Sequence, residues 1–246
     1  MRLIEGNEDL QDVVSLYNLR GFSLREYINI QTKSQFPSYS FSEILENHEQ
    51  IASEICQKVK PLLHMQNYLR HGFYPFFLEK RNYSENLLKT MNMMLEVDIL
   101  LIKQIDIKYL SRIRKLLYLL TQKAPVVPNV SLYSKEIETS RATVMNYMKY
   151  LKDARLLNLL YPQDQEFPKK PEKVYIHNTN LMYVVLGDEI EEESLRSTFF
   201  YNAVHVAEKL NFSKQADFLV AKKYEFNLTD KLVEREKNTS AYYAVQ

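Results

Sequence analysis

The 246-residue chain is long enough for about two domains, and its 46% hydrophobic and 26% charged residues are typical of a globular protein. Its single cysteine, Cys56, excludes an internal disulfide and a zinc site built from cysteines of this chain. No apolar run approaches the length of a membrane span, and the N-terminus lacks a charged-then-apolar leader. We therefore expect no membrane contact and a cytoplasmic location.

The placement of glycine excludes the common nucleotide-binding loops. The four glycines, Gly6, Gly21, Gly72 and Gly187, lie too far apart to form a phosphate-cradling loop. None of them is followed by Lys-Ser or Lys-Thr. The sequence therefore predicts neither a P-loop nor a Rossmann fingerprint.

The first hundred residues predict mainly helices. Ser23 is a helix cap before residues 24–29, and Glu26 completes a capping box with it. Residues 42–63 and 83–101 have the apolar spacing of amphipathic helices. In the first of these two helices, four apolar residues are expected to face inward: Ile44, Ile51, Ile55 and Val59.

Residues 107–176 predict a winged helix-turn-helix. A helix over 107–123 is ended by the proline-containing stretch 124–129, and a short helix over 132–137 follows. Thr139 and Ser140 offer an N-cap to a third helix. One face of that helix is apolar, with Val144, Tyr147, Met148 and Leu151.

Two apolar segments complete the winged helix. Residues 156–161 and 173–176 are strand-like and are separated by a polar turn, so they predict a β-hairpin, the wing. Three helices followed by such a hairpin are a specific arrangement, but it fixes shape rather than function.

The charge around this module indicates DNA as a partner. Between Lys108 and Arg155 the sequence has ten Lys or Arg against three acids, although the whole chain has a formal net charge of only +1. A recognition helix that meets phosphates needs such an excess. A spacer role between proteins remains an alternative, because Lys and Arg populate any solvated surface. The predicted DNA-binding residues are Lys135, Arg141, Thr143, Asn146, Lys149 and Lys152.

Several longer motifs resemble those of a prokaryotic, Bacteroidetes-type, AAA-type ATPase family. Residues 19–27, Leu-Arg-Gly-Phe-Ser-Leu-Arg-Glu-Tyr, resemble the family's GLSFREYL signature, and residues 68–76 resemble its YL-x-x-GYYPF segment. The winged-helix segment 124–151 is also similar, and residues 173–181 resemble KVYLDNTNL. The resemblance continues through residues 216–220 and so covers essentially the whole chain.

The resemblance implies that the nucleotide-binding part of the family is missing. Full-length members place an α/β domain with Walker motifs before the region that corresponds to Met1. The family's Asp-Leu-Ser-Arg-Arg segment corresponds here to residues 9–13, Asp-Leu-Gln-Asp-Val, so its paired arginines are replaced. Without these parts nothing would hold Mg-ATP, and we expect no ATP hydrolysis by this chain alone.

The tail resembles the family's C-terminal nuclease-type domain, which needs carboxylates around a magnesium ion. Asp217 stands at the family's Asp, but Asn227 and Ser197 stand where the family has Glu. Glu225 would point to the opposite face of its strand, because side chains alternate along a strand. We therefore expect no catalytic, metal-ligating or cofactor-binding residue.

The predicted fold class is mainly α with minor β (α+β). The predicted domains are a helical region over 1–104 that resembles the end of an ATPase domain and its lid, the winged helix over 105–178, and a partial nuclease-like α/β domain over 179–246. The predicted function is that of a non-catalytic member or fragment of the ATPase family that binds DNA. The alternatives are a split ATPase, a degenerate metal-dependent nuclease, or a winged helix that contacts protein.

The expected partners are DNA and either another protein or a second copy of the chain. Removal of a neighbouring domain would expose Val13, Val14 and Leu16, and self-association would cover them. No small-molecule substrate and no cofactor are expected.

Overall fold

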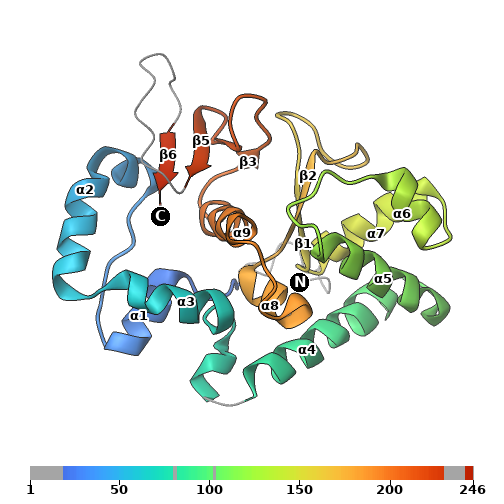
Figure 1. The fold of residues 1–246 in the computed structure, drawn as a ribbon, viewed down its shortest axis with the longest axis horizontal. Coiled ribbons are helices and arrows are strands. Elements are labelled where there is room, and N and C mark those ends of the chain that lie inside the picture. Colours follow the sequence, from blue (N-terminus) through green and yellow to red (C-terminus); the bar gives the residue numbers. More distant parts are fainter. Residues whose placement is uncertain (1–18, 80–81, 102–103, 230–241, 246) are drawn as a thin grey trace, which may run out of the picture.

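The computed structural model describes residues 19–79, 82–101, 104–229 and 242–245. Helices make up most of this part, and the strands form one hairpin and one small sheet (Figure 1). The prediction of a mainly α fold with a minor β component is confirmed. The segment with Val13, Val14 and Leu16 lies outside the described residues.

The N-terminal helices are α1 (Leu24–Thr32), α2 (Phe41–Lys58) and α3 (Pro61–His71). The capping box predicted for α1 is present: Ser23 Oγ accepts from the backbone N–H of Glu26, whose carboxylate accepts from the backbone N–H of Ser23. The single helix expected over 42–63 is wrong, because Pro61 disfavours a helical residue before it and starts a new helix instead.

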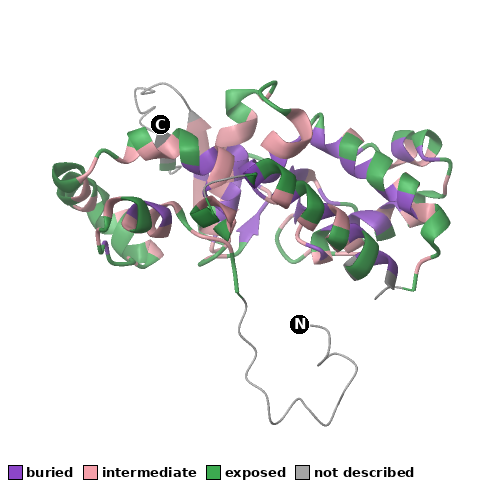
Figure 2. Ribbon diagram, turned by 90° about the horizontal axis from the view of Figure 1, so that it is seen from below, coloured by how far each residue is buried: buried purple, intermediate pink, exposed green. Residues whose placement is uncertain are grey.

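The expectation that Ile44, Ile51, Ile55 and Val59 face inward is wrong for Ile44, which is 43% exposed. The other three are half-buried, Val59 lies just after α2, and no residue of α2 is buried. Only the start of α2 reaches a core, where Phe41 packs against Tyr224 and Phe226. Exposed and half-buried residues dominate this end of the molecule in Figure 2, in contrast to the purple centre.

The helix expected over 83–101 is present as α4 (Tyr83–Met93), which continues as a π-helix over Met94–Leu101. The helix expected over 107–123 is α5 (Leu110–Thr121), preceded by a 3₁₀ turn at Ile107–Tyr109. Both apolar stripes face the main core.

The predicted order of winged-helix elements is present after α4. After α5 come α6 (Val130–Glu136), α7 (Arg141–Asp153), β1 (Leu157–Leu160) and β2 (Lys173–Ile176). The two strands pair antiparallel, with Leu157 opposite Ile176. Val126 forms an isolated antiparallel β-bridge with Val174 of β2. The two residues exchange backbone hydrogen bonds of 3.0 and 2.8 Å.

The C-terminal part contains α8 (Thr179–Leu186), α9 (Glu192–Val204) and a four-stranded sheet. Its strands are β3 (Leu210–Asn211), β4 (Phe218–Val220), β5 (Tyr224–Thr229) and β6 (Tyr242–Val245), in that order across the sheet. β4 pairs antiparallel with β3 and with β5, and β6 runs parallel to β5.

The main hydrophobic core joins α4 and α5 to the winged helix and α8. It runs from Tyr83 to Met182 and therefore includes residues on both sides of the boundaries predicted near 104 and 178. The division into three domains stays a prediction. A second core lies under the sheet around Phe218.

A buried polar clamp ties α3 to α8. Asn180 is fully buried, and its Nδ2 donates to the carbonyls of Tyr68 and Leu69 at 3.0 and 2.6 Å. Its Oδ1 accepts from the backbone N–H of Phe73 at 2.8 Å and from the hydroxyl of Tyr83. The same two carbonyls also accept from the backbone N–H of Gly72 at 2.8 Å and from the hydroxyl of Thr179 at 2.7 Å, so Asn180 gives each of them a second donor.

Among the helices in the described part of the chain, none is both long and apolar enough to cross a membrane.

Candidate nucleic-acid interface

The third helix of the winged helix, α7, has one buried and one exposed face. Ser140 caps it as predicted, since its Oγ accepts from the backbone N–H of Thr143 at 3.0 Å. The four residues predicted to face inward are all buried: Val144, Tyr147, Met148 and Leu151. The opposite face therefore presents the polar residues of the helix to solvent.

Four of the predicted site residues share this opposite face. Arg141, Asn146 and Lys152 are exposed, and Lys149 is half-buried. Asn146, Lys149 and Lys152 follow one another at intervals of three residues and so line one side of the helix. Arg141 lies in the first turn, five residues before Asn146, at the edge of the exposed face. The exposed donors are thus spread along a helix about 20 Å long.

The other two predicted residues are placed differently. Lys135 is exposed near the end of α6, on the helix before α7. The hydroxyl of Thr143 lies 2.8 Å from the cap hydroxyl of Ser140. Thr143 therefore takes part in the helix cap, which leaves its side chain less available to a ligand than the sequence suggested.

Ion pairs neutralise part of the positive charge counted in the sequence. Arg114 pairs with Glu96 at 2.7 Å, and Lys149 pairs with Asp153 at 3.4 Å. In the described part of the chain, six exposed cations of the module form no ion pair with a carboxylate: Lys123, Lys135, Arg141, Lys152, Lys169 and Lys170. These six supply the accessible positive charge.

Two of the six, Lys169 and Lys170, were missed by sequence reasoning, because they lie in the wing. Lys169 and Lys170 are exposed in the turn between β1 and β2. The Lys-Lys pair in the polar turn was the available signal. The wing lies beside α7, since Lys149 Nζ is 5.5 Å from the ring centroid of Phe167.

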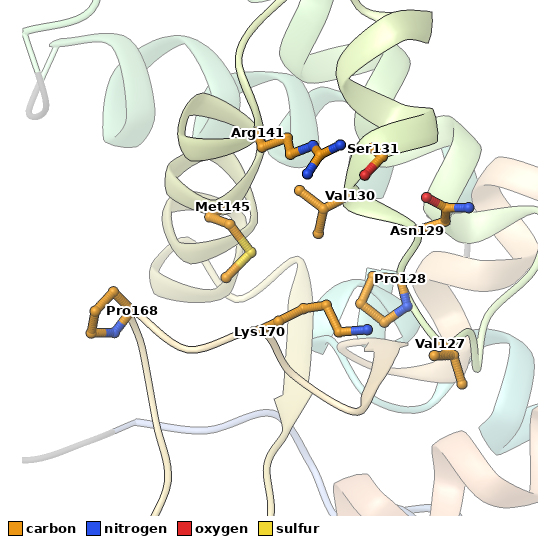
Figure 3. A pocket seen from close by; sticks show the side chains of 9 residues that line it. All are labelled: Val127, Pro128, Asn129, Val130, Ser131, Arg141, Met145, Pro168 and Lys170. Carbon is orange, nitrogen blue, oxygen red and sulfur yellow. The ribbon is translucent and has the colours of Figure 1, made fainter.

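A groove of about 620 Å³ lies between residues 127–131 before and at the start of α6, the start of α7, and the wing. Figure 3 shows Arg141 from α7 and Lys170 from the wing on either side of Val130, with Met145 on the α7 side. Its remaining lining residues are Val127, Pro128, Asn129, Ser131 and Pro168. The groove therefore has two cationic side chains, Arg141 and Lys170, among its lining residues.

The tail residues that the sequence compared with a nuclease centre have structural partners. Asp217 Oδ2 accepts from the backbone N–H of Leu228 at 2.9 Å, and its Oδ1 lies 3.9 Å from Lys173 Nζ. Glu225 accepts from the hydroxyl of Ser213 at 2.8 Å. Ser197 is buried in α9. Over the described ranges, no three His, Cys, Asp or Glu side chains lie together in a way that could hold a metal ion.

A partly buried histidine lies behind the wing, between β2 and α8. His177 Nδ1 is 3.2 Å from Asn158 Oδ1, and its ring packs edge-to-face on Phe73 and His205. Burial lowers the pKa of His177 to about 3, and the nearby His205, Arg155 and Arg20 act in the same direction. The imidazole is therefore neutral in the folded protein near neutral pH.

The fold and this surface define a mainly α protein built around a winged helix with a basic exposed face. The chain belongs to a family described as a domain of unknown function, DUF8612, whose model matches residues 63–192, more than half of the chain. The matched region contains the complete winged helix and α8. A search of the curated proteins returned no match. A search of the solved structures returned none either.

Proposed function

We propose that this protein binds double-stranded DNA through its winged helix and has no catalytic activity of its own. The observation that carries the proposal is the exposed surface of α7, which presents Arg141, Asn146 and Lys152 on a helix that lies beside the wing. Exposed cations without acidic partners attract phosphates, because each phosphate contact releases counterions from the DNA. Arg141 and Asn146 also have the donor groups that read base edges in the major groove.

The proposal assigns no reaction to the tail. Asp217, the residue that stands at the nuclease position in the resemblance, uses its two oxygens for Leu228 and Lys173. This supports a structural role in the turn before β4. We further propose, on the resemblance alone, that the chain is related to the AAA-type ATPase family, and that it acts in the cytoplasm.

Fluorescence anisotropy with a labelled mixed-sequence duplex of about 24 base pairs tests DNA binding. If about four phosphates are contacted, the affinity should fall about 100-fold between about 50 and about 200 mM salt. Arg141→Ala and Lys152→Ala should each weaken binding, and Lys152→Ala should reduce the salt slope by about 1. Lys149→Ala should have a smaller effect, because Asp153 already pairs with that charge.

Lys58→Ala is the matched control, because Lys58 is an exposed lysine at the end of α2, away from the winged helix (Figure 1). It should leave the affinity unchanged. The absence of salt-dependent binding at low salt would contradict the proposal and would favour protein contact as the role of the winged helix.

A second candidate function, contact with another protein or a second copy, is favoured by the exposed apolar side chains at the start of α3. Leu62 and Leu63 are 72% and 71% exposed, and α2 beside them buries no residue. Sizing with light scattering tests self-association: a dimer that Leu62→Ser and Leu63→Ser together convert to a monomer would support it, and a monomer at all concentrations would count against it.

A further inference from the structure

The groove beside α6 combines apolar and cationic lining residues. Val127 and Val130, before and at the start of α6, and Met145 of α7 supply apolar surface (Figure 3). Arg141 and Lys170 border the same groove, and within the described residues neither forms an ion pair with a carboxylate. An occupant that matches this groove has an apolar group and several negative charges.

The loop between α8 and α9 has both properties. Residues 188–193 are Asp-Glu-Ile-Glu-Glu-Glu, and all of these acids are exposed. Asp188 pairs with Arg70 at 2.5 Å. Ile190 packs at the edge of the main core and is half-buried, so part of its side chain is accessible between the acids. Among the described residues, no cation forms an ion pair with the other acids of the loop, which are Glu189, Glu191, Glu192 and Glu193.

Contacts within the chain fix the position of this loop. Gly187 ends α8 with a φ of +68°, a backbone angle that residues with a side chain rarely adopt. The ion pair with Arg70 ties Asp188 to α3. Glu192 and Glu193 stand in the first turn of α9, where negative charge is favoured. Because the backbone of the loop is already ordered, little conformational entropy is lost when the loop docks against another surface.

The groove and the loop lie in different parts of one chain. None of the described residues 188–193 lines the groove, and Figure 1 shows α8 and α9 near the middle of the molecule and α6 at one end. A contact between groove and loop therefore joins two copies. We propose that the groove beside α6 receives the α8–α9 loop of a second copy of this chain. Arg141 and Lys170 then pair with acids of that loop, and Ile190 faces Met145.

This contact is heterologous, because it joins two different surfaces, and it extends into a ring or an open chain of copies. It rests on the second candidate function, contact with a second copy, and gives it a surface different from Leu62 and Leu63. Arg141 also belongs to the proposed DNA surface, so a docked loop covers part of that surface. Self-association by this contact thereby competes with DNA binding.

Size-exclusion chromatography with light scattering tests the full-length protein at about 50 and about 500 mM salt, because exposed ion pairs are individually weak and are screened by salt. The wild type at high protein concentration should form dimers and longer assemblies at the lower salt concentration. It should be a monomer at the higher one.

Two double variants separate the two halves of the contact. Arg141→Ala/Lys170→Ala alters the groove, and Glu189→Lys/Glu191→Lys alters the loop. Each variant alone should be a monomer at the lower salt concentration. An equimolar mixture should form a heterodimer and nothing longer, because only the intact loop of the first variant and the intact groove of the second match. All four side chains are exposed and Glu191 makes no capping hydrogen bond, so both variants should keep the fold.

Glu46→Lys/Glu49→Lys is the matched control, because it reverses two exposed acids on α2, and it should associate like the wild type. A wild type that is monomeric at the lower salt concentration contradicts the second candidate function, and the inference falls with it. Association that both the groove variant and the loop variant retain overturns the inference alone. If Leu62→Ser and Leu63→Ser together remove that association, the second candidate function stands without this contact.

Discussion

Replacing Asn180 by leucine should lower the free energy of unfolding by about 3 kcal/mol or more. Leucine has nearly the same size, so the cost comes from the groups that lose their partners. These are the backbone N–H of Phe73 and the hydroxyl of Tyr83. The carbonyls of Tyr68 and Leu69 keep the backbone N–H of Gly72 and the hydroxyl of Thr179 as donors. Each buried polar group left without a partner costs about 1–3 kcal/mol. Urea denaturation followed by circular dichroism measures the change.

Asn67→Leu is the control for this experiment, because Asn67 is an exposed asparagine on α3. A surface substitution of this kind should change stability by no more than about 0.5 kcal/mol. Equal stability of Asn180→Leu and the wild type would show that the clamp between α3 and α8 contributes nothing beyond packing.

The elements of the winged helix could be predicted because their signals are local. Ser140 lies three residues before Thr143, whose N–H it caps, and the four buried residues of α7 follow the helical period. The hairpin strand at 173–176 was predicted with the bounds that β2 has. Val126 was not predicted as a strand partner, because its bridge to Val174 spans a long stretch of sequence.

The orientation of α2 could not be predicted, because an apolar stripe identifies the apolar side of a helix and not whether another element covers it. Ile44 lies on such a stripe and is still exposed. The role of Asn180 could not be predicted from the sequence either. Its partners in α3 lie about one hundred residues earlier in the chain, and only the fold brings them together.

The sequence predicts the part of the candidate site that lies on α7. It does not predict the part that lies in the wing. Counting Lys and Arg found Arg141 and Lys152, but it could not show that Arg114 pairs with Glu96 across two elements. It also stopped at Arg155 and so omitted Lys169 and Lys170. Surface charge depends on which cations find acidic partners, and that depends on packing between elements distant in sequence.

Lowering the pH from about 7 to about 5 should destabilise the protein by about 2 kcal/mol more than it destabilises His177→Gln. In the unfolded chain a histidine titrates near its usual pKa of about 6.5. In the folded protein the pKa of His177 is lowered to about 3 by burial, with His205, Arg155 and Arg20 adding to the effect. Between these two values the unfolded state binds more protons, so stability falls as the pH falls. Glutamine cannot gain the charge, so that variant should lose this dependence.

Urea denaturation at several pH values measures both proteins, and His48→Gln is the control, because His48 is exposed on α2. That variant should follow the wild type. His205 contributes in the same direction, since burial also lowers its pKa, so His177→Gln should reduce the dependence without abolishing it. The backbone N–H of His177 donates to the carbonyl of Leu156 at 3.0 Å, next to β1, so this histidine lies at the base of the wing. A pH dependence of stability that is identical in the wild type and in His177→Gln would contradict the prediction.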